Sequence, residues 1–284
     1  MTNPYIIVPL ALLFAPVLGA ILMGIDRKVT ARIQGRIGPP LFQPFYDVIK
    51  LLQKDKIAVN RFQILYAFLH LGFMLVVVVM IAMQQDMLMI LFAHAFSTMA
   101  LIMGGMCVRS PYSRIGSHRK ILQMIAYEPI LVLMVVGIYL ASPNHSFMIG
   151  ELSAGSPMLF ALPLVFLAIQ MAIAIKLQKS PFDTASSHHA HQEIVKGITI
   201  EYSGPFLAIL EITDFYEVAT LFAVIVLFCW PYTLVGVGVA MLCFSFQIIL
   251  DNSFARLSPM WMLKYMWTVP TLAALSNVIW LYYR

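Results

Sequence analysis

The chain has 284 residues, of which 61% are hydrophobic and only 11% are charged, and its mean hydropathy is +0.87. A soluble protein cannot bury so much apolar surface, so this composition excludes an ordinary water-soluble enzyme and predicts an integral membrane protein. The net charge of +5 does not indicate a nucleic-acid surface, because the basic residues gather in a few loops between apolar segments.

Apolar runs of about 20 residues recur along the chain, and this is the length of helix that crosses a hydrocarbon layer about 30 Å thick. They predict an all-α, polytopic membrane protein with about eight transmembrane helices, forming a single membrane domain over residues 1–284. The runs cover approximately Tyr5 to Ile25, Ile64 to Met83, Met87 to Val108, Ile121 to Ala141, Leu159 to Leu177, Pro205 to Cys229, Tyr232 to Leu250 and Met266 to Tyr283.

The first run is not preceded by a basic segment, since Met1 to Pro9 contains neither Lys nor Arg. A secretory signal peptide begins with such a segment, so we expect this run to stay in the mature protein as a helix.

The loop after the first run carries an amphipathic pattern. Apolar residues recur there at helical spacing, charged residues lie on the opposite face, and two prolines precede them. The apolar positions are Leu41, Phe45, Val48, Ile49 and Leu52, and the charged positions are Asp47, Lys50 and Lys54. This pattern predicts a helix that lies along the cytoplasmic surface of the membrane.

The Lys and Arg residues indicate an orientation. Of 18, 17 lie in alternate loops: eight from Arg27 to Arg61, four from Arg109 to Lys120, three from Lys176 to Lys196, and two at Arg256 and Lys264. The positive-inside rule assigns these loops to the cytoplasm. We therefore expect a multi-pass protein of the cytoplasmic (inner) membrane, with both termini on the outer side and partner proteins on the cytoplasmic face.

A polar stretch from Lys179 to Gly204 interrupts the apolar pattern, and the run after it contains three acids. Glu211, Asp214 and Glu217 are spaced three residues apart, so they lie on one side of a helix. A charge at the bilayer centre costs about 2.5–3.5 kcal/mol on insertion scales, and such residues therefore face protein or water. The pattern favours an ion or proton route, with a charged helix end packed against basic partner subunits as the alternative.

Motifs for redox cofactors are missing from the sequence. Cys107, Cys229 and Cys243 are spread over three apolar segments without C-x-x-C spacing, and there is no GxGxxG, P-loop or H-E-x-x-H motif. We expect no cofactor, no metal and no catalytic residue in this chain, so that electrons travel through other subunits.

Three ordered motifs are similar to those of a known family. Ala31 to Pro40, A-R-I-Q-G-R-I-G-P-P, with L-F-Q-P-F-Y-D-V-I-K-L-L after it, resembles the first cytoplasmic loop of the complex I subunit 1 family, which is also the family of the H subunit of NADH-quinone oxidoreductase. Ser110 to Pro129, with its Tyr127-Glu128 pair, resembles the connection between that family's third and fourth helices. Pro181 to Gly204 resembles its loop between the fifth and sixth helices.

The first loop distinguishes branches of this family. Quinone-reducing members usually carry a longer glycine-rich segment there, whereas here Gly38-Pro39-Pro40 passes directly to Leu41. The short form is similar to the membrane subunit of energy-converting nickel–iron hydrogenases and formate hydrogenlyase. The resemblance thus implies a membrane-anchor and ion-coupling subunit that links ferredoxin-dependent H2 chemistry to H+ or Na+ translocation.

The implied partners are the nickel–iron hydrogenase large and small subunits, an iron–sulfur subunit and an antiporter-like membrane subunit, with ferredoxin acting indirectly. Iron–sulfur clusters and the nickel–iron site are expected in those partners. Two alternatives stay open, a subunit of a quinone-reducing complex I-like enzyme and a free-standing ion transporter. The transporter is the weaker alternative, because residues 1–140 and 141–284 show no repeat of the kind common in transporters.

The resemblance also implies roles for individual residues. Acids that match the family's cytoplasmic connections and its sixth helix, with two neighbours on that helix, form the expected ion-translocation set: Glu128, Glu193, Glu201, Glu211, Asp214 and Glu217. Residues expected at the loop and partner interface are Arg36, Asp47, Lys50, Arg114, Arg119, Asp183, His189 and His191. The alternative for Arg114 and Arg119 is topology anchoring, and the alternative for Asp183 is a helix N-cap.

The histidines have open roles. His189 and His191 stand where the family has acids, and His188 stands beside them. We interpret the three histidines as a solvated polar loop, as a pH-responsive replacement for the acids or, with poorly suited spacing, as a metal site. His70 and His94 lie within apolar runs, where hydrogen-bonded packing is the first interpretation and a place for His94 in the ion relay is the second.

Overall fold

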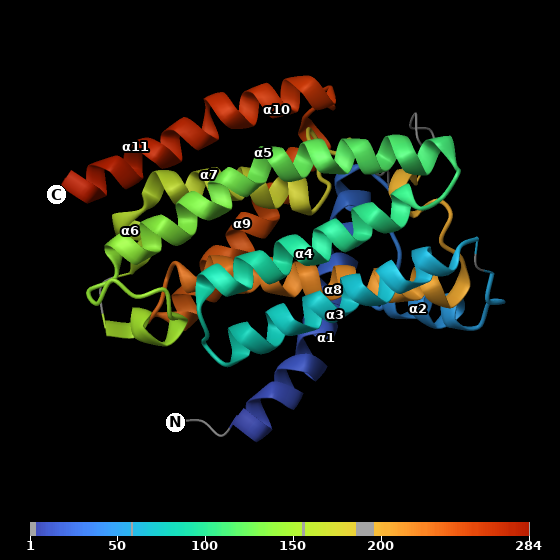
Figure 1. Cartoon of the computed structure of the whole chain (residues 1–284), viewed down its shortest axis with the longest axis horizontal. Helices are drawn as coiled ribbons and strands as arrows, with labels where there is room; N and C mark the ends of the chain where they lie inside the picture. Colours follow the sequence, from blue (N-terminus) through green and yellow to red (C-terminus); the bar gives the residue numbers. More distant parts are fainter. Residues whose placement is uncertain (1–3, 58, 155–156, 186–195, 284) are drawn as a thin grey trace. The chain divides into compact units, whose positions relative to one another are not determined.

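The computed structural model describes residues 4–57, 59–154, 157–185 and 196–283 (Figure 1). Over these ranges the chain is helical and forms no strand, apart from one isolated bridge between Asp86 and Met148. This confirms the all-α prediction. The elements are α1 (Pro4–Ile33), α2 (Gln43–Leu52), α3 (Arg61–Ala82), α4 (Met87–Met106), α5 (Pro111–Ala141), η1 (Ile149–Ala154), α6 (Met158–Ala161), α7 (Pro163–Lys176), η2 (Gly197–Thr199), α8 (Gly204–Leu227), α9 (Thr233–Ser253), α10 (Pro259–Thr268) and α11 (Pro270–Tyr283).

Five helices in the described ranges, α1, α3, α4, α5 and α9, are long and apolar enough to cross a membrane. The protein is therefore multi-pass, and the count of about eight stays a prediction. The other three predicted spans differ for local reasons. The fifth predicted span is divided at Leu162, which has non-helical backbone angles before Pro163. The sixth predicted span corresponds to α8, which carries three acids. The eighth predicted span is divided between α10 and α11 before Pro270.

Two helices extend beyond the apolar runs that predicted them. α1 ends at Ile33 rather than near Ile25, and α5 begins at Pro111 rather than near Ile121. The added turns carry many of the basic residues of the first two loops that were predicted to be cytoplasmic. Hydropathy indicates only the part of a helix that lies in hydrocarbon, so it cannot detect a helix that continues into the polar region.

The predicted amphipathic segment is helical. α2 begins with a proline in its first turn, as expected, and the ring centroid of Phe45 lies 6.3 Å from that of Phe215 on α8. Its place along the membrane surface stays a prediction.

The described chain divides into two compact units. Unit 1 contains Met1–Met83, Ala93–Ile121 and Thr184–Thr220, and unit 2 contains Gln84–Phe92, Leu122–Asp183 and Leu221–Arg284. The expected single membrane domain stays a prediction.

In unit 1, α1 contacts α2 and α3, and two glycines of α1 allow close backbone approach. A Cβ atom on Gly19 would lie 1.9 Å from the carbonyl oxygen of Phe215, and one on Gly24 would lie 2.0 Å from that of Leu41. Any side chain at Gly19 would therefore force α1 away from α8, and any side chain at Gly24 would force it away from the segment just before α2.

In unit 2, the core forms around α7, which contacts α6 and α11. Asn277 of α11 compensates for the break before Pro163. Its Oδ1 atom accepts a hydrogen bond from the Leu164 amide at 3.0 Å, and its Nδ2 atom donates to the Ala161 carbonyl at 3.2 Å. The interrupted backbone is thus hydrogen-bonded inside an apolar core, where an unsatisfied polar group would be costly.

Candidate ion-coupling site

The three acids of α8 lie in unit 1, and all of them are half-buried. Asp214 is influenced electrostatically by Glu211 and Glu217 on its own helix and by the cations Lys120 and Lys196. Lys120, in the basic first part of α5, is only 4% exposed. Cations from two other segments therefore offset the charge of acids that lie in an otherwise apolar helix.

The contacts of α8 with α1 fix the rotation of the helix next to these acids. The Tyr216 hydroxyl donates a hydrogen bond to the Leu12 carbonyl at 2.8 Å, and Gly19 admits the carbonyl of Phe215, as described above for α1. Phe215 and Tyr216 are the two residues that follow Asp214. A rotation of α8 would break both contacts, so the acids are held in a defined direction.

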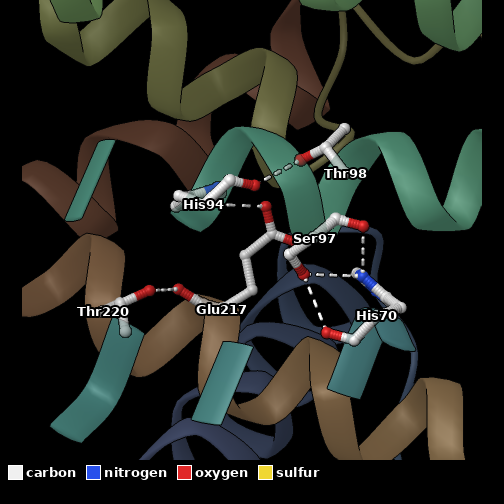
Figure 2. Close-up of polar contacts among 6 residues, drawn as sticks. All are labelled: His70, His94, Ser97, Thr98, Glu217 and Thr220. Carbon is white, nitrogen blue, oxygen red and sulfur yellow. Dashed lines mark hydrogen bonds and ion pairs between the residues drawn. The ribbon is translucent and has the colours of Figure 1, made fainter. Parts of the chain in front are cut away.

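Glu217 faces a histidine of α4. Figure 2 shows the two side chains directed toward one another, with Nε2 of His94 at 3.8 Å from Oε1 of Glu217. The exposed fractions of the two side chains are 15% and 16%. When the imidazole is protonated, this contact is an ion pair between α4 and α8.

A second histidine joins α3 to α4 beside this pair (Figure 2). Nδ1 of His70 lies 2.8 Å from both the carbonyl oxygen and the hydroxyl of Ser97, and the Ser97 hydroxyl donates to the His70 carbonyl at 2.9 Å. His70 is buried. The interpretation of His70 as a hydrogen-bonded packing residue therefore has a structural basis. His94 instead contacts the carboxylate of Glu217, and a place in the ion relay requires such a contact.

Glu201 is half-buried in the turn between η2 and α8, next to the buried Tyr202. Small residues allow this segment to approach α4 and α5. A Cβ on Gly104 would lie 2.1 Å from the Tyr202 hydroxyl oxygen, and one on Gly116 would lie 2.5 Å from the Ile198 amide nitrogen. Burial, and to a smaller extent the nearby Cys107 thiol, raises the pKa of the Tyr202 hydroxyl.

Glu128 lies in unit 2, half-buried on α5, with Lys176 as an opposite charge nearby. Lys176 is the last residue of α7 and is 6% exposed, and its Nζ atom lies 4.6 Å from the centroid of the Tyr127 ring. The Tyr127-Glu128 pair therefore has a buried cationic neighbour. Sequence reasoning missed this neighbour because a Lys at the end of an apolar run has the pattern of a topology marker.

The described residues of unit 2 include ion pairs that sequence reasoning did not identify, and one of them joins Lys179 Nζ and Asp251 Oδ2 at 3.1 Å. Another joins Arg256 and Asp183, with Nη2 of Arg256 at 3.7 Å from Oδ2 of Asp183. Arg256 also donates to the Asp183 carbonyl. Asp183, expected at a partner interface, is thus buried and bonded within the chain.

The other interface candidates differ in exposure. Arg36, Lys50 and Arg114 are exposed, so they are accessible to partners in the isolated chain. Asp47 instead accepts from Arg27 at 2.6 Å and from Gln43 at 2.9 Å.

Arg119 is also engaged within the chain, because its Nη1 atom donates to the Thr184 carbonyl at 3.3 Å. Three candidates, Glu193, His189 and His191, and also His188, lie outside the described residues. Their predicted roles stay predictions.

The described residues contain no group of three or more His, Cys, Asp or Glu side chains placed to hold a metal ion. The expectation that this chain carries no redox cofactor stays a prediction.

Comparison with known proteins extends over nearly the whole chain. The NADH dehydrogenase family matches residues 6–282. The H subunits of NADH-quinone oxidoreductase from Bacillus thuringiensis (strain Al Hakam) and Bacillus cereus (strain B4264) are each 30% identical to this chain over 316 aligned residues, which cover 98% of this chain and 93% of the relative.

Among solved structures, a chain of the membrane-bound sulfane sulfur reductase, an archaeal respiratory membrane complex, is similar with a TM-score of 0.83 and 23% identity. The match covers 98% of this chain and 99% of that chain. At this identity the likeness concerns the fold alone.

Proposed function

We propose that this chain, which belongs to the NADH dehydrogenase family, is the membrane-anchor and ion-coupling subunit of an energy-converting nickel–iron hydrogenase complex in the cytoplasmic membrane. In this function it links ferredoxin-dependent H2 chemistry in partner subunits to the movement of H+ or Na+. The chain itself supplies no electron carrier, so its contribution is to hold the partners and to pass on a cation.

The observation that carries the ion-coupling proposal is the group of acids on α8. Glu211, Asp214 and Glu217 are half-buried in a helix that is otherwise apolar, where an unused carboxylate would only destabilise the protein. Acids this close to one another exchange protons as a coupled set, so a charge change at one site alters the occupancy of the next. A redox event at the cytoplasmic face can therefore move a cation along the set.

The hydrogenase branch is supported by the compact first loop. Gly38 adopts a left-handed backbone conformation, with φ of +77°, and a Cβ there would lie 2.9 Å from that of Ala31. The carbonyl of Leu41 likewise lies close to Gly24 of α1. The loop over residues 34–42 therefore packs against α1. The short form of this loop is the one that resembles the hydrogenase branch.

A second candidate function is that of the membrane subunit of a quinone-reducing complex. It is favoured by the 30% identity to the H subunit of NADH-quinone oxidoreductase. In this case the same cytoplasmic loops would line a quinone pocket. Purification of the complex that contains this chain distinguishes the two candidates. We expect ferredoxin-linked hydrogen turnover with nickel–iron subunits present, whereas reduction of a quinone analogue at comparable rates would establish the second candidate.

Amide substitutions test ion coupling. Asp214→Asn and Glu201→Gln keep side-chain size and remove the titrating group, so we expect ion uptake into proteoliposomes to fall by about tenfold or more while the complex assembles normally. Asp86→Asn is the matched control, since Asp86 caps α4 through the Leu88 amide at 2.7 Å and Asn caps equally well. Full transport in assembled Asp214→Asn and Glu201→Gln complexes would show that these acids are structural.

A further inference from the structure

The polar stretch over residues 179–204 begins directly after a sharp end of α7. Gln178 has a left-handed backbone conformation there, with φ of +51°. Its amide donates to the Ile175 carbonyl at 3.1 Å. The next amide, that of Lys179, donates to the Ala174 carbonyl at 3.0 Å, which completes the hydrogen-bonding pattern of a Schellman C-cap. Glycine usually occupies the left-handed position of this motif, so the glutamine is strained and depends on the contacts around it.

Asp251, in the last turn of α9, contacts the first two residues of the polar stretch. Its Oδ1 atom accepts a hydrogen bond from the Ser180 amide at 2.8 Å, and its Oδ2 atom lies 3.1 Å from Nζ of Lys179. An acid in the last turn of a helix is unfavourable for the helix dipole. The contacts with the polar stretch, rather than the stability of α9, therefore explain why an acid stands at this position.

The next two residues of the stretch are held by hydrogen bonds to their carbonyls and by ring packing. The Pro181 carbonyl accepts from the Leu257 amide at 2.9 Å, and the Phe182 carbonyl accepts from Nε2 of Gln123 at 2.8 Å. The buried ring of Phe182 also stacks on that of Tyr265, with the two centroids 6.1 Å apart. These contacts come from α5, from the connection between α9 and α10, and from α10.

Arg256 holds the fifth residue, Asp183, through the ion pair and the hydrogen bond to its carbonyl. Every residue from 179 to 183 therefore contacts a segment that is far away in the sequence. Lys179 and Asp183 have further interactions as well, so the position of the segment does not depend on one charge pair. Contacts that converge from several elements give the segment a single defined position.

We propose that Asp251 is a positioning residue for ion coupling, which anchors the start of the polar stretch to α9. The inference rests on the proposed function, because this stretch leads to Glu201 of the expected ion-translocation set. Coupling between distant sites is carried by packed and hydrogen-bonded segments with defined arrangements. Without an anchor, the start of the stretch would rearrange in response to a redox event, and less of that event would reach the acid.

Hydrogen–deuterium exchange in the assembled complex measures the anchoring directly. Wild type is compared with Asp251→Ala and Lys179→Gln, and the matched controls are Ser253→Ala and Lys264→Gln, whose side chains are exposed on α9 and α10. We expect the peptide that contains residues 179–183 to exchange about tenfold or more faster in Asp251→Ala, because a backbone amide loses its acceptor. The increase should be smaller in Lys179→Gln, which keeps that acceptor, and the controls should follow wild type.

The number of ions moved per H2 turned over in proteoliposomes measures the effect on coupling. We expect this ratio to fall by about twofold or more in Asp251→Ala, while H2 turnover per assembled complex is retained. A merely structural role would lower the amount of assembled complex and leave the ratio unchanged. If Asp251→Ala does not assemble, the same two measurements on Lys179→Gln decide the proposal.

The possible outcomes separate this inference from the proposed function. Unchanged exchange in Asp251→Ala would overturn the anchoring, and faster exchange with a wild-type ratio of ions to H2 would overturn the role of Asp251 in coupling. A wild-type complex that moves no ion would contradict the proposed function, whereas the exchange measurement would still decide the anchoring.

Discussion

Tyr202 is a buried residue whose hydroxyl has no hydrogen-bond partner within the described part of the chain. Removing such a hydroxyl should cost little, so we expect Tyr202→Phe to change the stability of the solubilised protein by less than about 0.5 kcal/mol at pH 7. At high pH the two proteins should differ. The raised pKa of Tyr202 in the folded protein means that the unfolded chain releases this proton first.

The unfolded tyrosine titrates near pH 10, so stability from this group is fully present below about pH 10 and is lost as the pH rises above it. Thermal unfolding between neutral pH and pH 11 should therefore show a smaller loss of Tm for Tyr202→Phe than for wild type. Tyr46→Phe, at an exposed position, is the control and should follow wild type. If Tm fell equally with pH in wild type, Tyr202→Phe and Tyr46→Phe, the raised pKa of Tyr202 would be contradicted.

Individual residues also show where sequence reasoning ends. The α8 acids and Glu201 could be identified because a motif or a helical spacing contains them. The partners of these acids could not, since His94 is more than a hundred positions from Glu217 and Lys176 is far from Glu128 in the sequence. Which faces meet depends on the rotation of each helix, and packing contacts decide that rotation rather than hydropathy.

The close approach of the segment that contains η2 to α4 and α5 depends on the small size of residues on those two helices. A Cβ at Gly116 would lie 2.5 Å from the backbone nitrogen of Ile198, and a backbone atom cannot move aside as a flexible side chain can. We expect Gly116→Ala to destabilise the protein by about 1–3 kcal/mol and to displace the segment before Glu201, which lowers ion transport as well. Thermal unfolding and transport in proteoliposomes measure the two effects.

Gly72→Ala is the matched control, because Gly72 is also helical and has nothing within 4 Å of the added Cβ. There the substitution should leave transport intact and stabilise α3 by up to about 1 kcal/mol through its higher helix propensity. If Gly116→Ala were as stable as wild type, the close approach of η2 to α5 would be wrong.

At the level of elements, the apolar runs located every long helix and the amphipathic pattern located α2. They failed at helix ends and at prolines. Two runs that read as continuous in hydropathy are interrupted before Pro163 and Pro270. Leu162 leaves the helical region of backbone angles, as the residue before a proline tends to do. Val269 keeps helical angles, and the break there follows from the backbone N–H that Pro270 lacks. The Asn277 contacts that stabilise one of these breaks could not be predicted from either segment alone.

For the whole molecule, composition established the membrane class, and the ordered loop motifs indicated the family. The division into two compact units was not predicted, because it depends on contacts between segments far apart in the chain. Orientation depends on a different physical rule, the cost of moving basic loops across the membrane, and it is independent of helix packing.

That rule gives a whole-molecule prediction that single cysteines can test. In a variant with Cys107, Cys229 and Cys243 replaced by Ala, we expect Asn144→Cys to react with a membrane-impermeant maleimide in right-side-out vesicles and Lys54→Cys to react only in inside-out vesicles. Both positions are exposed, so access depends on the side of the membrane rather than on burial. Lys54 lies in the most basic loop, whereas residues 142–157 contain no Lys or Arg. Detergent-solubilised protein, labelled at both sites, is the control. The reverse labelling pattern would invert the topology and place the Glu201 turn, with its expected partner subunits, on the outer face.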